Sequence, residues 1–196
     1  MKSFLKKNNK LNRAFTLVET LIAISIFSIS VLALMSVLGQ GISNTNYAKQ
    51  KILASYLAQE GVEYIRNMRD TYVLYSATST LGWSAFNTKL NDASCGGVNG
   101  CYFDNRNVSF SDTTMPMTDL ILSACLSSGC PQGILLYDSS TGKYNYVSGT
   151  NSGFTRKIQI SQPDGNQTKI SSTVSWTQGS GVYSTTFSES LFNWVQ

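Results

Sequence analysis

The chain has 196 residues, with 15 Lys and Arg against 11 Asp and Glu, four Cys, three Pro and no His. The absence of histidine excludes Ser/His/Asp and Cys/His nucleophile systems, His-ligated zinc sites and an imidazole general base. An enzyme is therefore not expected. Charged residues make up only 13% of the chain, about half the usual share, and this favours an exported, β-rich surface protein. The meaning of the formal charge of +4 depends on where the charges lie.

The basic residues are concentrated at the N-terminus. Residues 1–14 contain no acid and carry five cationic side chains, Lys2, Lys6, Lys7, Lys10 and Arg13. The rest of the chain has ten basic residues against 11 acidic ones, a net charge of −1. From residue 71 onward there are six basic and seven acidic residues. Because this part has no basic excess, no nucleic-acid partner is expected.

An apolar segment follows the basic one. Residues 21–38 are Leu, Ile, Val, Ala, Phe and Met interrupted only by serines, and no charge occurs between Thr20 and Ala48. Taken as a helix, residues 15–38 reach about 36 Å, which is enough to cross a hydrocarbon core of about 30 Å. The basic flank predicts a cytoplasmic N-terminus, with the rest of the chain translocated.

Two simpler interpretations of this segment do not fit. A secretory signal peptide has a shorter apolar region of about 7–15 residues and a small-residue cleavage site, and no such site follows here. A plain membrane anchor needs no acid, whereas Glu19 lies inside the apolar segment. An intramembrane carboxylate is costly and marks a functional position that requires a partner. Cleavage before Phe15 would create an α-amino group of complementary charge four residues away.

Residues 13–23 read RAFTLVETLIA, which resembles the class III signal of type IV prepilins and type II secretion pseudopilins. The resemblance implies that a membrane-embedded prepilin peptidase cuts between Ala14 and Phe15 and that Phe15 is then N-methylated. It also implies that Glu19 serves assembly by meeting the N-terminal ammonium of a neighbouring pilin subunit in a bundle of helices. The family usually has Gly before the cleaved bond, and Ala14 departs from this pattern while remaining small.

Helical periodicity continues beyond the apolar segment. Between residues 46 and 70, apolar side chains recur at spacings of three and four, as in an amphipathic helix. Joined, the two segments predict one helix over residues 15–70, about 84 Å long. Gly39 and Gly41 mark the expected place for a bend or local melting, or else for close packing. The apolar stripe of the second segment comprises Ile52, Leu53, Tyr56, Leu57, Tyr64, Ile65 and Met68.

The remaining residues predict a head in two parts. Residues 71–133 are loop-rich and contain the cysteines, with one short helix expected around residues 82–90. Residues 134–196 predict an antiparallel sheet, because alternating apolar residues are separated by Gly, Pro, Asp and Asn turn residues. The expected fold class is α+β and pilin-like, with a long N-terminal helix packed on this sheet. The predicted strands are 134–137, 143–147, 154–161, 168–176 and 182–188, and three or four of them are expected in meander order.

The predicted sheet carries a second resemblance. The strings GFTRKIQI (153–160), VSWT (174–177) and LFNW (191–194) resemble the C-terminal strands of PilV-like minor pilins. Arg156 shares the alternation of Phe154 and Ile158. It is therefore expected to face inward and to need a carboxylate or carbonyl partner.

The cysteine spacing favours disulfide bonds over a metal site. Five residues separate Cys95 from Cys101, and four separate Cys125 from Cys130. A four-cysteine zinc site is the alternative, but it would be awkwardly spaced. Thiols placed outside the membrane oxidise. The favoured pairs are Cys95–Cys101 and Cys125–Cys130, because Gly and Ser make both short loops flexible, while the crossed pairings stay open. No metal or cofactor is predicted.

These features predict a minor type IV pilin, processed between Ala14 and Phe15, that enters or primes a pilus filament through its N-terminal helix. The alternatives are a type II secretion pseudopilin and an uncleaved single-pass surface adhesin. The precursor is expected as a single-pass protein of the cytoplasmic membrane, and the mature chain in an extracellular pilus or at the cell surface. The expected partners are prepilin peptidase, other pilin subunits and the membrane.

Overall fold

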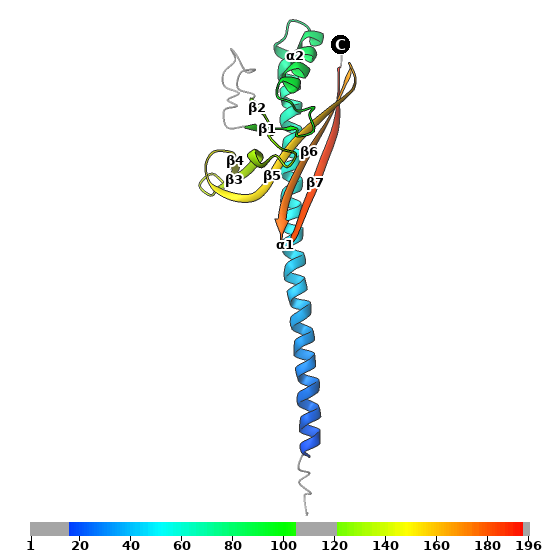
Figure 1. Ribbon diagram of the computed structural model, residues 1–196, viewed down its shortest axis with the longest axis vertical. Helices are drawn as coiled ribbons and strands as arrows, with labels where there is room; N and C mark the ends of the chain where they lie inside the picture. The colour runs from blue at the N-terminus through cyan, green and yellow to red at the C-terminus, as the bar shows by residue number, and fades with distance from the viewer. Residues whose placement is uncertain (1–15, 105–120, 194–196) are drawn as a thin grey trace, which may run out of the picture. The chain divides into compact units, whose positions relative to one another are not determined.

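The computed structural model describes residues 16–104 and 121–193. The chain divides into two compact units, Met1–Asn46 and Tyr47–Gln196. Helix α1 (Leu17–Tyr75) begins in the first unit and ends in the second, which holds all the other elements (Figure 1). These are helix α2 (Ser79–Asp92), the 3-10 helix η1 (Pro131–Gly133) and strands β1 (Cys101–Asp104), β2 (Ile121–Ala124), β3 (Ile134–Asp138), β4 (Lys143–Asn145), β5 (Thr150–Asp164), β6 (Gln167–Gln178) and β7 (Gly181–Phe192).

The end of α1 and the start of α2 lie close together. α1 continues to Tyr75, five residues past the end predicted from periodicity. α2 is capped by Thr78, whose hydroxyl accepts a hydrogen bond from the Leu81 amide at 3.3 Å, as an N-cap residue does. A Cβ on Gly82 would lie 2.6 Å from the Tyr72 carbonyl oxygen. Glycine at this position therefore allows α2 to pack against the last turns of α1.

The strands form one antiparallel sheet in which β5 is central. One edge of β5 pairs with β6, and the other edge pairs with β3 near its start and with β1 at Ile158. β6 then pairs with β7 over twelve consecutive residue pairs. The predicted meander order is correct for β5, β6 and β7. The meander does not include the preceding hairpin, because β3 rather than β4 lies beside β5.

The sheet also extends into the region predicted to be loop-rich. β1 and β2 pair with each other and join the sheet through the single pair Cys101 and Ile158. Each of these strands has only four residues. A run this short shows too little alternation to be recognised from sequence. The antiparallel α+β arrangement predicted from sequence is confirmed, but the sheet begins earlier in the chain than expected.

The second part of α1 packs on the sheet through a face that combines small residues with large apolar ones. Four residues of the predicted apolar stripe are buried, namely Leu57, Tyr64, Ile65 and Met68, whereas Ile52 and Tyr56 are 58% and 66% exposed. The buried face follows residues at spacings of three and four beginning at Ala54. Small side chains bring the helix axis close to the sheet. The buried residues of α1 are Ala54, Leu57, Ala58, Gly61, Val62, Tyr64, Ile65, Met68 and Tyr72.

Candidate functional site

The first turn of α1 carries the carboxylate that the sequence singled out. The Thr16 hydroxyl accepts a hydrogen bond from the Glu19 amide at 3.3 Å, and the Thr16 carbonyl accepts one from the Thr20 amide at 3.2 Å. Glu19 is exposed in this turn. The positive end of the helix dipole favours an acidic side chain there. Local structure therefore presents Glu19 outward at the start of the helix.

The Glu19 carboxylate makes no ion pair with any residue in 16–104 or 121–193. The basic leader 1–14, with Ala14, and the predicted methylation site Phe15 lie outside the described residues. The structure thus places Glu19 but not the predicted cleavage site. Any ion-pair partner of this carboxylate therefore lies outside the described residues.

The helix that follows Glu19 is long and apolar enough to cross a membrane, and it is the one such helix among the described residues. Its large apolar side chains from Leu17 to Ile42 are exposed, except for Val31, which is half-buried. The hydroxyls of Ser25 and Ser30 donate hydrogen bonds to the carbonyls four residues earlier, at 2.9 and 2.8 Å. Groups satisfied within the helix do not oppose insertion into hydrocarbon. The helix is suited to lipid or to a bundle of apolar helices.

Gly39 and Gly41, the expected place for a bend, lie within the continuous helix. A Cβ added to either glycine would meet nothing within 4 Å among the described residues. The intramolecular packing of this segment therefore does not require glycine. Each glycine still lowers the helix propensity of this segment, by about 1 kcal/mol relative to alanine. The prediction of a bend or local melting therefore rests on this lower propensity.

Two disulfide bonds hold the cysteine-containing region. Cys95 pairs with Cys101 and Cys125 pairs with Cys130, and no cysteine is free. The first bond connects the segment after α2 to β1, and the second closes the loop after β2. With every sulfur in a disulfide, no thiolate remains for the zinc site considered from sequence.

Arg156 is the buried cation of the interface between helix and sheet. Its side chain is 1% exposed and its Nη1 donates to a Glu60 carboxylate oxygen at 2.7 Å and to the Leu57 carbonyl at 3.2 Å. Its Nε donates to the Tyr146 hydroxyl at 3.0 Å. Burial acts to lower the pKa of Arg156, but Tyr146 and Glu60 hold it above its ordinary value. The inward orientation and carboxylate partner predicted for Arg156 are confirmed.

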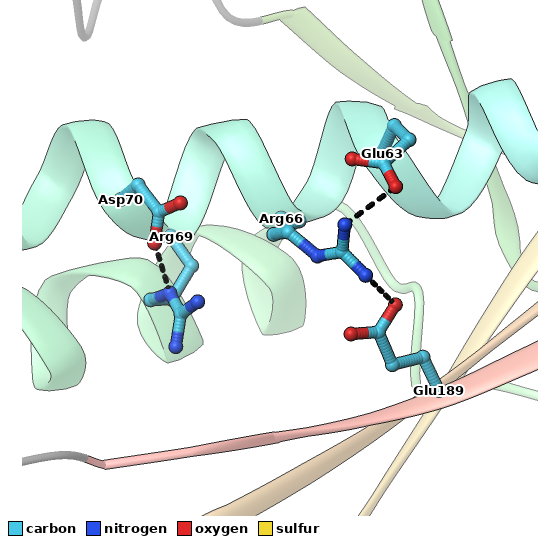
Figure 2. Close-up of polar contacts among 5 residues, drawn as sticks. All are labelled: Glu63, Arg66, Arg69, Asp70 and Glu189. Carbon is cyan, nitrogen blue, oxygen red and sulfur yellow. Dashed lines mark hydrogen bonds and ion pairs between the residues drawn. The ribbon is translucent and has the colours of Figure 1, made fainter.

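A second ion pair, which sequence reasoning missed, ties α1 to the edge strand β7. Figure 2 shows the Arg66 guanidinium between Glu63 of the same helix and Glu189 of β7. The hydrogen bond to Glu189 is the main cause that raises the pKa of Arg66 above its ordinary value. One turn further, Arg69 pairs with Asp70 and donates to the Phe192 carbonyl at 3.3 Å. No local pattern links residues 123 positions apart, so only the fold reveals these contacts.

Comparison with protein families gives a match for the N-terminal segment of the chain. Residues 9–35 match the family described as the prokaryotic N-terminal methylation motif. Comparison with curated proteins and with solved structures found no match. The matched segment contains Ala14, Phe15 and Glu19 and runs into the exposed apolar part of α1.

The family match supports the pilin superfamily, either a type IV pilin-like protein or a pseudopilin, and points to a structural protein rather than an enzyme. Such a motif implies processing by prepilin peptidase and assembly with pilins and the membrane. Together with the apolar helix, it supports a membrane-anchored precursor that later reaches a pilus or the cell surface.

Proposed function

We propose that this chain is a minor type IV pilin, a structural subunit that is cut by prepilin peptidase and enters or primes a pilus filament. One observation carries the proposal. The methylation motif over residues 9–35 brings together a basic leader, the Ala14–Phe15 junction, Glu19 and an exposed apolar helix. The strands β5 and β6, with their Thr-Arg-x-Ile and Val-x-Trp strings, support the PilV-like subgroup by resemblance.

Processing changes the charge of the N-terminus in a defined way. Hydrolysis of the Ala14–Phe15 peptide bond releases the leader with its five cationic side chains and creates an α-ammonium group on Phe15. Methylation of this nitrogen keeps its positive charge. The mature chain therefore begins with a single cation directly before the apolar helix and carries Glu19 four residues later.

Assembly then depends on Glu19. Its carboxylate is exposed and has no ion-pair partner among the described residues. In a bundle of apolar helices an unpaired carboxylate is costly, whereas one that meets a cation is compensated. The N-terminal ammonium of a neighbouring subunit supplies that cation. A subunit in the correct axial position is thereby favoured over one shifted along the helix.

The decisive experiment is intact-mass analysis and N-terminal sequencing of the protein extracted from membranes. An N-methylated Phe15 start supports the proposal. A retained Met1 would exclude processing and would favour the uncleaved surface adhesin instead.

Processing alone does not separate a pilin from a type II secretion pseudopilin, since both share the N-terminal segment. Purification of sheared surface filaments makes this distinction. The processed chain should co-purify with pili in substoichiometric amount. Its absence from pili, together with loss of protein secretion on deletion, would instead assign it to a secretion system.

A further inference from the structure

An aromatic cluster occupies one end of the second unit. Tyr47 on α1 contacts Tyr183 of β7, with ring centroids 5.1 Å apart, and Trp176 of β6, at 6.1 Å. The Trp176 and Tyr183 rings stack at 5.9 Å. The ammonium of Lys51 lies 5.9 Å from the centre of the Tyr47 ring. We call these four residues the Tyr47 cluster.

The cluster borders an exposed apolar tip. Val182, directly after the β6–β7 turn, is 77% exposed, and Tyr183 is 40% exposed. Figure 1 shows this turn and α2 at opposite ends of the second unit. The buried side of the cluster is closed by Trp176, which is 3% exposed. The fold therefore presents amphipathic rings and one valine at a single end of the unit.

The first residue of the cluster lies close in sequence to the end of the apolar run. Tyr47 is the first residue of the second unit, and it lies nine positions after Leu38, the end of the apolar run. Even a fully extended chain of that length spans only about 30 Å. Connectivity alone thus keeps the Tyr47 cluster near the end of the membrane segment.

The charged residues that follow Tyr47 most closely along the chain are both basic. No charged residue occurs from Thr20 to Ala48, and the next two are Lys49 and Lys51, both exposed. The first acid after them is Glu60, which is engaged with buried Arg156. The start of the second unit is therefore basic. Lysines next to a membrane segment are attracted to anionic lipid headgroups.

We propose that the Tyr47 cluster, together with Lys49, binds the headgroup region of an anionic bilayer and holds the head at the membrane surface before the subunit enters a filament. Tyr and Trp rings favour this region because one end is apolar and the other forms hydrogen bonds with water and headgroups. The inference rests on the membrane anchoring in the proposed function. It adds a lipid-binding surface on the head itself, outside the methylation motif.

The test uses the full chain in nanodiscs of 70% phosphatidylcholine and 30% phosphatidylglycerol that contain a trace of headgroup-nitroxide lipid. A fluorophore is attached to one introduced thiol, in V182C at the tip of the cluster or in L81C on α2. Leu81 is 59% exposed, so both sites accept a label. Quenching should be at least threefold stronger at residue 182 than at residue 81.

Charge reversal tests the role of the lysines. K49E/K51E should reduce quenching at residue 182 by at least half, as should nanodiscs without phosphatidylglycerol. The matched control K143E/K169E makes the same charge change at two exposed lysines that do not belong to the cluster, and it should leave quenching unchanged. Equal quenching at residues 182 and 81, or an equal effect of both double variants, would overturn the proposal.

Two further measurements separate lipid binding by the head from loss of membrane anchoring and from contact between heads. A label in S28C, inside the apolar segment, should be quenched by acyl-chain nitroxide lipid in every variant. Loss of this signal would show that membrane anchoring itself fails, whereas its presence without quenching at residue 182 would remove only the lipid-binding surface. Quenching at residue 182 that disappears at one chain per nanodisc would assign the surface to contact between heads and would also overturn the proposal.

Discussion

Gly61 of α1 lies directly against Ser172 of β6. A Cβ built on Gly61 would come to 3.0 Å from the Ser172 Cβ and would overlap the hydroxyl of that residue. The Ser172 side chain is buried, and its oxygen has no hydrogen-bond partner among the described residues. At this point the close approach of α1 to β6 depends on glycine on the helix and on a small side chain on the strand.

G61A is expected to destabilise the head by about 1–3 kcal/mol, because the added methyl group overpacks the interface. S172A should be neutral or stabilising by up to about 1 kcal/mol, because it removes a buried hydroxyl that lacks a partner. The double variant G61A/S172A should regain part of the unfolding free energy that G61A loses. Urea unfolding of the full chain in detergent, followed by tryptophan fluorescence, measures all three. If the changes in unfolding free energy of the two single variants simply add in the double variant, the two side chains do not interact.

Glu60 should matter more than its partial exposure suggests. E60A leaves the buried Arg156 cation without a carboxylate partner and is expected to cost about 3 kcal/mol in unfolding free energy. R156M removes the charge together with its need for a partner and should cost less. The control E63A breaks an exposed pair on the same helix and should cost no more than about 1 kcal/mol. Equal costs for E60A and E63A would contradict this account of the interface.

The disulfides should protect all four sulfurs and stabilise the region after α2. Alkylation of the native full chain is expected to label no thiol, and label should enter after reduction. Replacing Cys95 and Cys101 together with alanine should cost about 2 kcal/mol, the loop-entropy value for so short a ring. Both residues are fully buried. Labelling of four thiols in the native protein would refute both bonds.

Local patterns predicted most of the secondary structure, and long-range contacts account for what they missed. Alternation correctly indicated β5 and β6, and inward-facing Arg156 followed from the same alternation. The periodicity of α1 correctly places Leu57, Ile65 and Met68 on the buried stripe, whereas Tyr56 of the same predicted stripe is exposed. The fold also buries Ala54 and Gly61, because a helix that approaches a sheet closely needs small side chains as well as apolar ones.

The candidate functional residues likewise include some that a local pattern predicts and some that only long-range contacts bring together. Ala14, Phe15 and Glu19 form a contiguous string, so sequence alone indicated the processing and assembly segment. The Tyr47 cluster joins residues from α1, β6 and β7 that are more than a hundred positions apart. Its members form no pattern along the chain. Only the register of β6 with β7 and their packing on α1 bring them together.

The residue before the cleaved bond should limit the rate of processing. Prepilins usually have glycine where this chain has Ala14, so A14G is expected to raise the rate of leader removal, while a bulky residue in A14L should block it. A pulse-chase experiment with co-expressed prepilin peptidase, read out as the mass shift on loss of residues 1–14, measures the rate. Unchanged processing of A14L would show that cleavage does not occur at Ala14–Phe15.

Removing the Glu19 carboxylate should separate processing from assembly. E19A should be cut at normal efficiency, because the cleaved bond lies five residues away, but its incorporation into filaments should fall at least about tenfold, the effect of losing 1.4 kcal/mol. E19D should retain part of the incorporation, since the charge remains. T20A is the matched control, because the Thr20 hydroxyl donates only to the Leu17 carbonyl in the same turn. Quantitative immunoblots of sheared filaments against membrane pools measure incorporation, and normal incorporation of E19A would remove the proposed pairing with the neighbouring N-terminus.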